Sequence, residues 1–242
     1  NLIGDPTTHL WTTTPKLMTA THESSVAMGT NYIDVNIQDM DGNPLNSARV
    51  TLYKEEEIFS NSFTDQNGFV NIPLTYTNYG DISLVVTEQG YKPIISTLTI
   101  ENPNGGVVNL NPNSNIMIND SNGNNNQEIN PGELIELSIP ITNYGNSGLN
   151  NFNVEITSSS PMVTIVNESE IVNSLNSGGL TTVNGLSFQL DSGAKHNENL
   201  GITLEIISST GTWNSQLNLM VDGYDFEIIN TISGDGSPID PG

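Results

Sequence analysis

The chain has 242 residues, of which 27 are Asp or Glu and 5 are Lys or Arg, so its formal net charge at pH 7 is −22. This charge repels nucleic acid and anionic membrane surfaces, and it predicts that neither is a partner. The chain contains no cysteine, which excludes a disulfide framework, a thiol nucleophile and a thiolate metal site.

Apolar residues in the first half of the chain recur at every second position, which is the pattern of strands with one buried face. The runs end at segments that favour turns, among them residues 41–44 and 65–68. About seven strands are expected here, which predicts an immunoglobulin-like sandwich over residues 15–108. Three of the expected buried faces are Ile33, Val35 and Ile37, then Ala48, Val50 and Leu52, then Ile82, Leu84 and Val86.

Residues 101–113 are rich in Asn, Gly and Pro and mark a domain junction. The same alternation over residues 109–222 predicts a second sandwich, in whose core Trp213 is expected. The expected fold class is therefore all-β, with two tandem immunoglobulin-like antiparallel β-sandwich domains. No apolar run has the length of a membrane-spanning helix, so membrane insertion is not expected. Alternating faces in this half include Ile135, Leu137, Ile139 and Ile141, then Phe152, Val154 and Ile156.

Residues 120–133, DSNGNNNQEINPGE, are rich in side chains that carry an oxygen. Calcium takes about six to eight oxygen ligands in flexible geometry, so alternating Asp and Asn closed by a carboxylate suit it. The segment is not an EF-hand loop, because Asn125 and Pro131 occupy the positions of that loop's Gly and final Glu. A metal-free turn explains the same composition, since Asn, Asp and Gly dominate turns. The candidate calcium ligands are Asp120, Asn122, Asn124, Asn126, Glu128 and Glu133.

The polar segment begins again near the end of the chain. Residues 129–132 (INPG) match residues 239–242 (IDPG), and Gly123 matches Gly234. An offset of about one sandwich domain fits a tandem array of modules that each fold on their own core. Residues 223–242 are therefore expected to start a further, truncated repeat, and the chain is expected to be a piece of a longer protein.

The histidines and serines do not form a recognisable catalytic pattern. His9, His22 and His196 lie far apart, without a second His or a carboxylate at metal spacing, so a zinc site is not expected. The sequence has no Gly-x-Ser-x-Gly motif, and serine hydrolase chemistry is not expected either. We expect that this chain is not an enzyme.

Three short motifs lie within residues 39–91, at residues 41–50, 64–68 and 90–91. With them the region resembles the immunoglobulin-like or prealbumin-like accessory modules of secreted bacterial enzymes and adhesins. This resemblance implies a fold rather than a function. The second module, with its opening loop at residues 120–133, and its truncated successor are similar to repeats of secreted bacterial surface proteins whose opening loop reads D-x-x-G-D-G-x-x-x-P-G-E.

The opening residues NLIGDPT, residues 1–7, resemble the segment that closes the catalytic domain of gingipain-type cysteine peptidases and directly precedes an immunoglobulin-like module. The resemblance implies that residues 1–14 end an upstream catalytic domain, whose nucleophilic Cys and partner His lie outside this chain. It further implies a secreted or cell-surface bacterial parent, exported through a sorting domain that this chain lacks.

Together these resemblances predict a noncatalytic structural or spacer region of a peptidase-like surface protein. Its expected partners are a calcium ion and the neighbouring domains of the parent. Two alternatives remain open. One is an adhesin or carbohydrate-binding module, whose loops contact a surface glycan or protein ligand. The other is a self-assembling surface fibre component, in which an unfinished strand pairs with the open sheet edge of a neighbouring chain.

Overall fold

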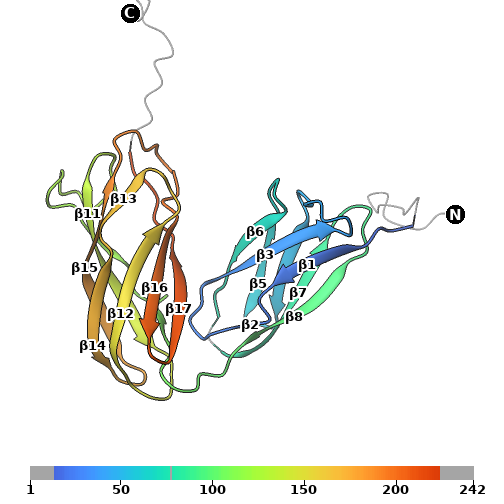
Figure 1. Ribbon diagram of the computed structural model, residues 1–242, viewed down its shortest axis with the longest axis horizontal. Coiled ribbons are helices and arrows are strands. Elements are labelled where there is room, and N and C mark those ends of the chain that lie inside the picture. Colours follow the sequence, from blue (N-terminus) through green and yellow to red (C-terminus); the bar gives the residue numbers. More distant parts are fainter. Residues whose placement is uncertain (1–13, 77, 224–242) are drawn as a thin grey trace, which may run out of the picture.

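The computed structural model describes residues 14–76 and 78–223, which fold into two separate β-sandwiches joined by one connection (Figure 1). The first domain contains strands β1 to β8 and the second contains β9 to β17. The expected fold class, two tandem immunoglobulin-like antiparallel sandwiches, is confirmed. The described residues contain no helix that is long and apolar enough to cross a membrane.

The first domain packs a three-stranded sheet, in the order β1-β3-β6, against a five-stranded sheet, in the order β2-β8-β7-β4-β5. The pairing of β2 with β8 is parallel, and the other pairings are antiparallel. The strands are β1 (Met18–His22), β2 (Ser25–Val26), β3 (Tyr32–Asp39), β4 (Arg49–Lys54), β5 (Ile58–Phe63), β6 (Phe69–Pro73), β7 (Gly80–Thr87) and β8 (Ile94–Ile100).

The second domain packs the sheet β10-β11-β15-β13, in which β9 also pairs with β11, against the sheet β14-β12-β16-β17. All of these pairings are antiparallel. The strands are β9 (Val108–Leu110), β10 (Met117–Asn119), β11 (Leu134–Asn143), β12 (Leu149–Ser158), β13 (Val163–Asn167), β14 (Ser169–Leu175), β15 (Leu180–Leu190), β16 (Ile202–Ser208) and β17 (Gly211–Leu217).

Each domain has its own hydrophobic core, built from the faces that alternation predicts. The alternate apolar side chains predicted in residues 33–37, 48–52 and 82–86 are buried in the first core, and Trp213, 8% exposed, belongs to the second. The second core takes in Val107 and Val108, which precede the domain boundary expected at residue 109. The upstream segment expected in residues 1–14 and the truncated repeat expected in residues 223–242 lie almost wholly outside the described residues.

One edge of β11 changes partner along its length. It pairs with β10 at residues 136–138 and with β9 at residues 141–143. Pro140 lies between these pairings, where its carbonyl accepts a hydrogen bond from Asn111 N at 2.9 Å. Because proline has no backbone N–H, it cannot return this bond, and the ladder is interrupted. The chain leaves the sheet after Asn111 and forms the loop 111–116 before it rejoins the sheet as β10.

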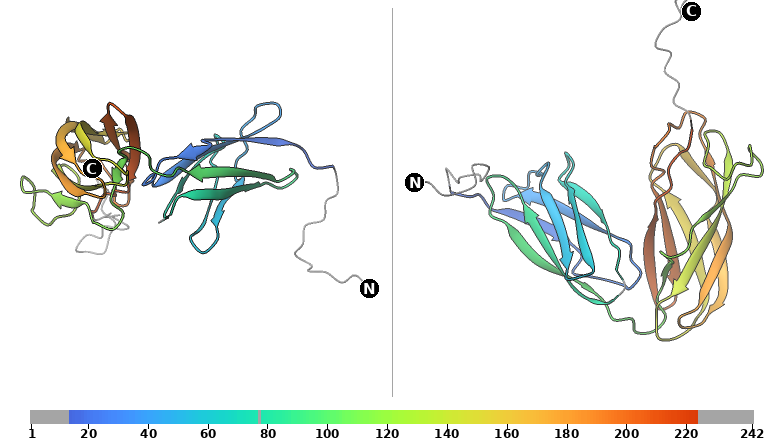
Figure 2. Two further views of the ribbon diagram at one scale, coloured as in Figure 1. Left: turned by 90° about the horizontal axis from the view of Figure 1, so that it is seen from below. Right: turned by 180° about the vertical axis from the view of Figure 1, so that it is seen from behind.

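The molecule is bent where the domains meet. In Figures 1 and 2, one end of the first domain lies against the side of the second domain along β17. Met28 and Asn31, which precede β3, make hydrogen bonds across this contact to Asn109 on β9 and Gln216 on β17. Since β17 is an edge strand of its sheet, an open row of backbone groups faces the first domain there.

Candidate functional site

The loop 120–133 joins β10 to β11 and contains all six predicted calcium ligands. Asp120 is 0% exposed, and its carboxylate accepts hydrogen bonds from Asn126 N at 2.9 Å and Gln127 N at 3.2 Å. Asn125 and Gln127 have φ values of 58° and 66°, so the backbone turns sharply around this carboxylate. Asp120 therefore organises the loop, with one backbone N–H bonded to each of its oxygens.

Amide side chains fill the rest of the loop. Asn124 and Asn126 both donate through Nδ2 to Asn130 Oδ1, at 2.7 and 2.9 Å, and Asn126 Nδ2 also donates to Glu128 Oε2 at 2.9 Å. Asn122 is exposed, and its side chain makes no hydrogen bond to another described residue. The loop is thus held by local hydrogen bonds between groups that a cation would have to rearrange.

Glu133 reaches back over the loop from the start of β11. Its Oε1 accepts a hydrogen bond from Asn124 N at 3.0 Å, and a Cβ at Gly123 would lie 2.4 Å from the same oxygen. Its Oε2 is buried and has no hydrogen-bond partner among the described residues. A buried polar atom without a partner is costly, and a cation is one group that would satisfy it.

The structure gathers Asp120, Asn124, Asn126, Glu128 and Glu133 in one loop. No cluster of three or more carboxylate, imidazole or thiol side chains that could hold a metal occurs within residues 14–76 and 78–223. Amide oxygens would therefore have to supply much of a coordination shell, and calcium binding at this loop stays a prediction.

The loop is also attached to the end of the described chain. Asn130 Nδ2 donates to Asp222 O at 2.9 Å, and Asp222 N donates to Ile129 O at 2.8 Å. Residues 120–133 therefore hold the segment through which the chain leaves the second domain. Whatever stiffens this loop also stiffens that exit.

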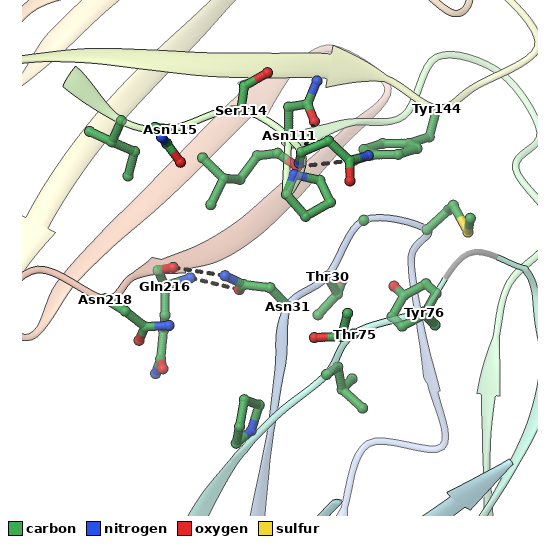
Figure 3. Close-up of a pocket in the computed structure, with 18 of the residues that line it drawn as sticks. Thr30, Asn31, Thr75, Tyr76, Asn111, Ser114, Asn115, Tyr144, Gln216 and Asn218 are labelled. Atoms are coloured by element: carbon green, nitrogen blue, oxygen red, sulfur yellow. Dashed lines mark hydrogen bonds between the residues drawn. The ribbon is translucent and has the colours of Figure 1, made fainter. Parts of the chain in front are cut away.

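The junction between the domains is built from a second set of polar side chains. Asn31 uses both ends of its side-chain amide on the backbone of β17: Nδ2 donates to Gln216 O at 2.7 Å, and Oδ1 accepts from Gln216 N at 2.8 Å (Figure 3). An amide that bonds a backbone in this way imitates the next strand of the sheet. Asn31 therefore covers the open edge of β17 at this point.

Asn109 makes a second hydrogen-bonded link between the domains. It lies on β9 and is 0% exposed. Its Nδ2 donates to Met28 O in the first domain at 3.0 Å, and its Oδ1 accepts from Ser215 Oγ at 3.1 Å. A buried polar group left without a partner costs about 1–3 kcal/mol, so these bonds favour the observed arrangement of the domains over one that breaks them.

Gly29 lets the two domains approach closely. Its φ is 90°, and a Cβ there would lie 2.6 Å from Asn109 Cβ and 2.6 Å from Tyr144 Cε2. The backbone of the first domain thus packs directly on the ring of Tyr144. The Tyr144 hydroxyl donates to Leu110 O at 3.1 Å, and burial raises the pKa of this tyrosine. Only glycine combines this backbone conformation with so short an approach.

An open cleft of about 940 Å³ lies beside these contacts. Figure 3 shows the loop 111–116 of the second domain on one side and residues 28–31 and 73–76 of the first domain on the other, with Gln216 and Asn218 at one end. Tyr76 lines the opposite end; its hydroxyl donates to Ala27 O at 3.1 Å, and burial raises its pKa. The cleft is therefore walled by both domains and depends on how they are joined.

The residues of this junction were only partly foreseen. The composition of residues 101–113 pointed to a domain boundary, but nothing in the sequence singled out residues 28–31. The available signal was Gly29 among small and polar residues, a pattern that marks a turn without saying which distant residues it meets. The pairing of Asn31 with Gln216 joins positions separated by 185 residues, which a local pattern does not reveal.

The two described histidines, His22 and His196, make separate contacts. His22 Nε2 is 2.8 Å from Ser96 Oγ, and His196 Nδ1 is 3.7 Å from Asp222 Oδ1; His9 lies outside the described residues. A Ser–His contact alone is not a catalytic site, because acyl transfer also needs an oxyanion site and a place for the substrate beside the nucleophile. Neither His22 nor Ser96 lines the interdomain cleft.

No known family profile matches the chain, and no curated protein matches it. Among solved structures, the BSP domain of a biofilm associated protein aligns over 87% of this chain and 31% of its own, at 8% identity and a TM-score of 0.32. Native Escherichia coli alpha-2-macroglobulin aligns over 85% and 16%, at 10% identity and a TM-score of 0.37. The D0-D1 domain of intimin aligns over 84% and 96%, at 11% identity and a TM-score of 0.29.

The chain spans less than a third of the first two of these proteins. At such identities and scores, the likeness carries no argument about a ligand, a partner or the placement of the domains. The fold assignment rests instead on the strand pairing and on the two cores of the chain itself.

Proposed function

We propose that the chain is a noncatalytic structural region that holds neighbouring domains of a bacterial surface protein at a set distance and angle. The observation that best supports this is the junction, where Asn31 and Asn109 bond across the domains and Gly29 packs against Tyr144. Relative motion of domains is the default unless their interface is large and hydrophobic, so a fixed angle at a polar junction needs specific contacts. Buried, satisfied hydrogen bonds supply that specificity here.

The proposed parent is a secreted, gingipain-type peptidase-like protein. This part of the proposal depends on the resemblance of residues 1–7, which lie outside the described residues. The chain itself has no cysteine, so a cysteine nucleophile would have to lie elsewhere in the parent. A spacer role is consistent with the strongly acidic composition, which keeps an extracellular surface solvated.

Calcium at the loop 120–133 is a further part of this proposal. The buried, unpartnered Oε2 of Glu133 supports it, together with the oxygen-rich composition of the loop. Bound calcium would neutralise Glu133 and cross-link the loop oxygens. Because Asn130 ties the loop to Asp222, the ion would also stiffen the path to whatever follows the second domain.

The spacer role is tested by the spread of distances between spin labels on the two domains. The chain has no cysteine, so Thr97→Cys on β8 and Asn173→Cys on β14, both exposed, give two unique labelling sites. A single narrow distance distribution is expected. The pair Asn173→Cys and Asn214→Cys, within the second domain, measures the width due to the labels alone. An interdomain distribution far broader than this control would reject a fixed junction.

The calcium component is tested by thermal unfolding with calcium and with a chelator. Glu133→Gln keeps the shape of the side chain but removes its charge, and Glu168→Gln removes an exposed charge on the same domain. At a calcium concentration of 100 times Kd, binding stabilises the folded state by about 2.7 kcal/mol. Calcium should raise the Tm of the native chain and of Glu168→Gln, but not of Glu133→Gln. An unchanged Tm in the native chain removes calcium from the proposal.

A further inference from the structure

The interdomain cleft is neutral in a molecule that is otherwise strongly acidic. Every described residue that lines it is uncharged, although the chain carries a formal net charge of −22. An anionic ligand is opposed by the charge of the whole molecule, and a cationic ligand finds no carboxylate among the described lining residues. The electrostatics of the cleft therefore favour an uncharged ligand.

Hydrogen-bonding groups in the cleft are left free. The side-chain amides of Asn115, Gln216 and Asn218 make no hydrogen bond to another described residue, and the same holds for the hydroxyls of Thr30 and Thr75. In Figure 3, Asn115 lies on the wall of the second domain, while Gln216 and Asn218 lie at one end of the cleft. Each amide offers both a donor and an acceptor. Sugar hydroxyls, which also donate and accept, complement such groups.

Two tyrosine rings stand at the other end of the cleft. Tyr76 and Tyr144 come from different domains and appear together there in Figure 3. Each hydroxyl donates to a backbone carbonyl of its own domain, of Ala27 and of Leu110 respectively, so the rings are held in place. Binding sites for small ligands combine apolar ring surface with a few placed polar groups, and this cleft has both.

A peptide that adds a strand to the sheet fits this cleft less well than a sugar does. Strand addition needs an open sheet edge with free backbone donors and acceptors. At the cleft that edge belongs to β17, and Asn31 already bonds both the N–H and the carbonyl of Gln216. The free side-chain amides in the cleft, those of Asn115, Gln216 and Asn218, do not form the regular row of backbone donors and acceptors that strand addition needs.

We propose that the cleft between the two domains binds a neutral oligosaccharide, that is, one without carboxylate, sulfate or amine groups. The ligand lies between the loop 111–116 and residues 28–31 and 73–76, with Asn115, Gln216 and Asn218 bonding its hydroxyls. This binding role goes beyond the structural role proposed above. It uses the fixed junction, because each domain supplies one wall of the cleft.

The first test is an array of immobilised oligosaccharides probed with the whole 242-residue chain. The array carries neutral glucans, mannans, galactans, xylans and N-acetylglucosamine polymers beside sialylated and sulfated glycans. Retention on at least one neutral class is expected, with none on the charged glycans. Retention on charged glycans only, or on none, overturns the proposal. Failure of the spacer role would appear instead in the spin-label distances, so the two failures are distinguishable.

Matched variants then locate the site by calorimetric titration with the retained glycan. Asn115→Asp and Asn218→Asp keep the shape of each side chain but replace its donor with a negative oxygen, and each should weaken binding on the order of tenfold. Thr75→Trp, at an exposed position, should block the cleft and abolish binding. Asn173→Asp adds the same charge on β14, at the opposite edge of the sheet from β17, and should leave affinity unchanged. Equal affinity in all four variants overturns the proposal.

Discussion

Gly29 is the residue at which a single methyl group would separate the two domains. In Gly29→Ala the new Cβ would lie 2.6 Å from Asn109 Cβ, shorter than the distance real Cβ atoms keep. We expect this variant to broaden the distance distribution between spin labels on the two domains. Gly42→Ala is the control, because Gly42 has a similar φ of 82° with nothing within 4 Å of its Cβ position. It carries only the left-handed backbone strain, about 1–2 kcal/mol.

Comparing Gly29→Ala with Gly42→Ala distinguishes the effect of backbone strain from the effect of a steric contact across the junction. Both should lower stability, because an L side chain is disfavoured at these φ values. Only Gly29→Ala should change the interdomain distances. If both variants keep the native distribution, close packing at Gly29 does not fix the domain arrangement.

Asn143 shows how one buried amide holds several segments together. Its Oδ1 accepts from Val107 N at 3.1 Å and Gly145 N at 2.9 Å, and its Nδ2 donates to Ser147 O at 2.9 Å and Leu175 O at 3.1 Å. Asn143→Asp turns that donor into an oxygen facing two carbonyls. A carboxylate buried without a compensating partner costs about 3–5 kcal/mol, so a loss of that order in unfolding free energy is expected at pH 7.

The loss in Asn143→Asp should depend on pH. Burial beside two carbonyl oxygens would raise the folded-state pKa of the introduced carboxyl above its unfolded value of about 3.9. The folded state then favours the protonated form, so the penalty is smallest below about pH 4 and grows as the pH rises. Urea unfolding of the variant and the native chain at pH 4 and pH 7 measures the difference. A penalty that is equal at both values contradicts the assigned hydrogen bonds.

At the scale of the element, Asp65 holds the turn between β5 and β6. Its Oδ1 accepts from Phe69 N at 2.9 Å and Asn67 N at 2.8 Å. The bond from Phe69, with smaller help from Asn67, lowers the pKa of Asp65 below its ordinary value. Since the folded pKa lies below the unfolded value, this stabilisation is present above about pH 4 and is lost as the pH falls through the folded pKa.

Asp65→Ala should therefore lower the Tm more at pH 7 than at pH 3. Asp41→Ala is the matched control, because Asp41 is an exposed aspartate in another turn of the same domain whose carboxylate accepts no hydrogen bond from a described residue. Thermal unfolding of both variants at the two pH values makes the comparison. A decrease in Tm that is the same at pH 3 and pH 7 would show that the carboxylate does not hold the turn.

The strands themselves were predictable because a strand with one buried face needs an apolar residue at every second position. Residues 33–37 and 82–86 show this alternation, and the structure buries every second side chain in each, starting from Ile33 and from Ile82. The loop 111–116 has no comparable pattern in its sequence. Its position depends on Pro140, on a different strand, whose missing N–H interrupts the ladder opposite Asn111. Such a feature is non-local, and neither segment alone reveals it.

The candidate sites were also predictable only in part. Composition located the loop 120–133, because oxygen-bearing residues next to one another can be read directly. Composition did not reveal that both oxygens of Asp120 accept hydrogen bonds from the loop backbone. Nor did it reveal that Glu133 Oε2 is buried without a hydrogen-bond partner among the described residues. The interdomain cleft was not predictable, since its walls come from five separate parts of the chain and exist only after the domains dock.

At the scale of the whole molecule, the net charge and the junction act on the two domains in opposite directions. Charge repulsion separates the domains, and the contacts of the junction hold them together. A net charge of −22 pushes two acidic domains apart, and this repulsion is screened by salt, with a Debye length of about 10 Å at 0.1 M and about 3 Å at 1 M. The contacts that hold the domains, Asn31 with Gln216 and Asn109 with Met28, join uncharged groups. Salt should therefore weaken the repulsion without weakening the junction.

The interdomain distance distribution of the native chain should then stay the same from low salt to about 1 M NaCl, because the junction and not the long-range field sets the angle. Asn31→Ala removes both bonds to Gln216 and uncovers the edge of β17. In this variant the distribution should be broad at low salt and should narrow toward shorter distances as salt is added. Spin-label measurements on both proteins across the salt range make the test. A native distribution that shortens with salt would mean that repulsion, rather than the hydrogen-bonded junction, holds the domains at their angle.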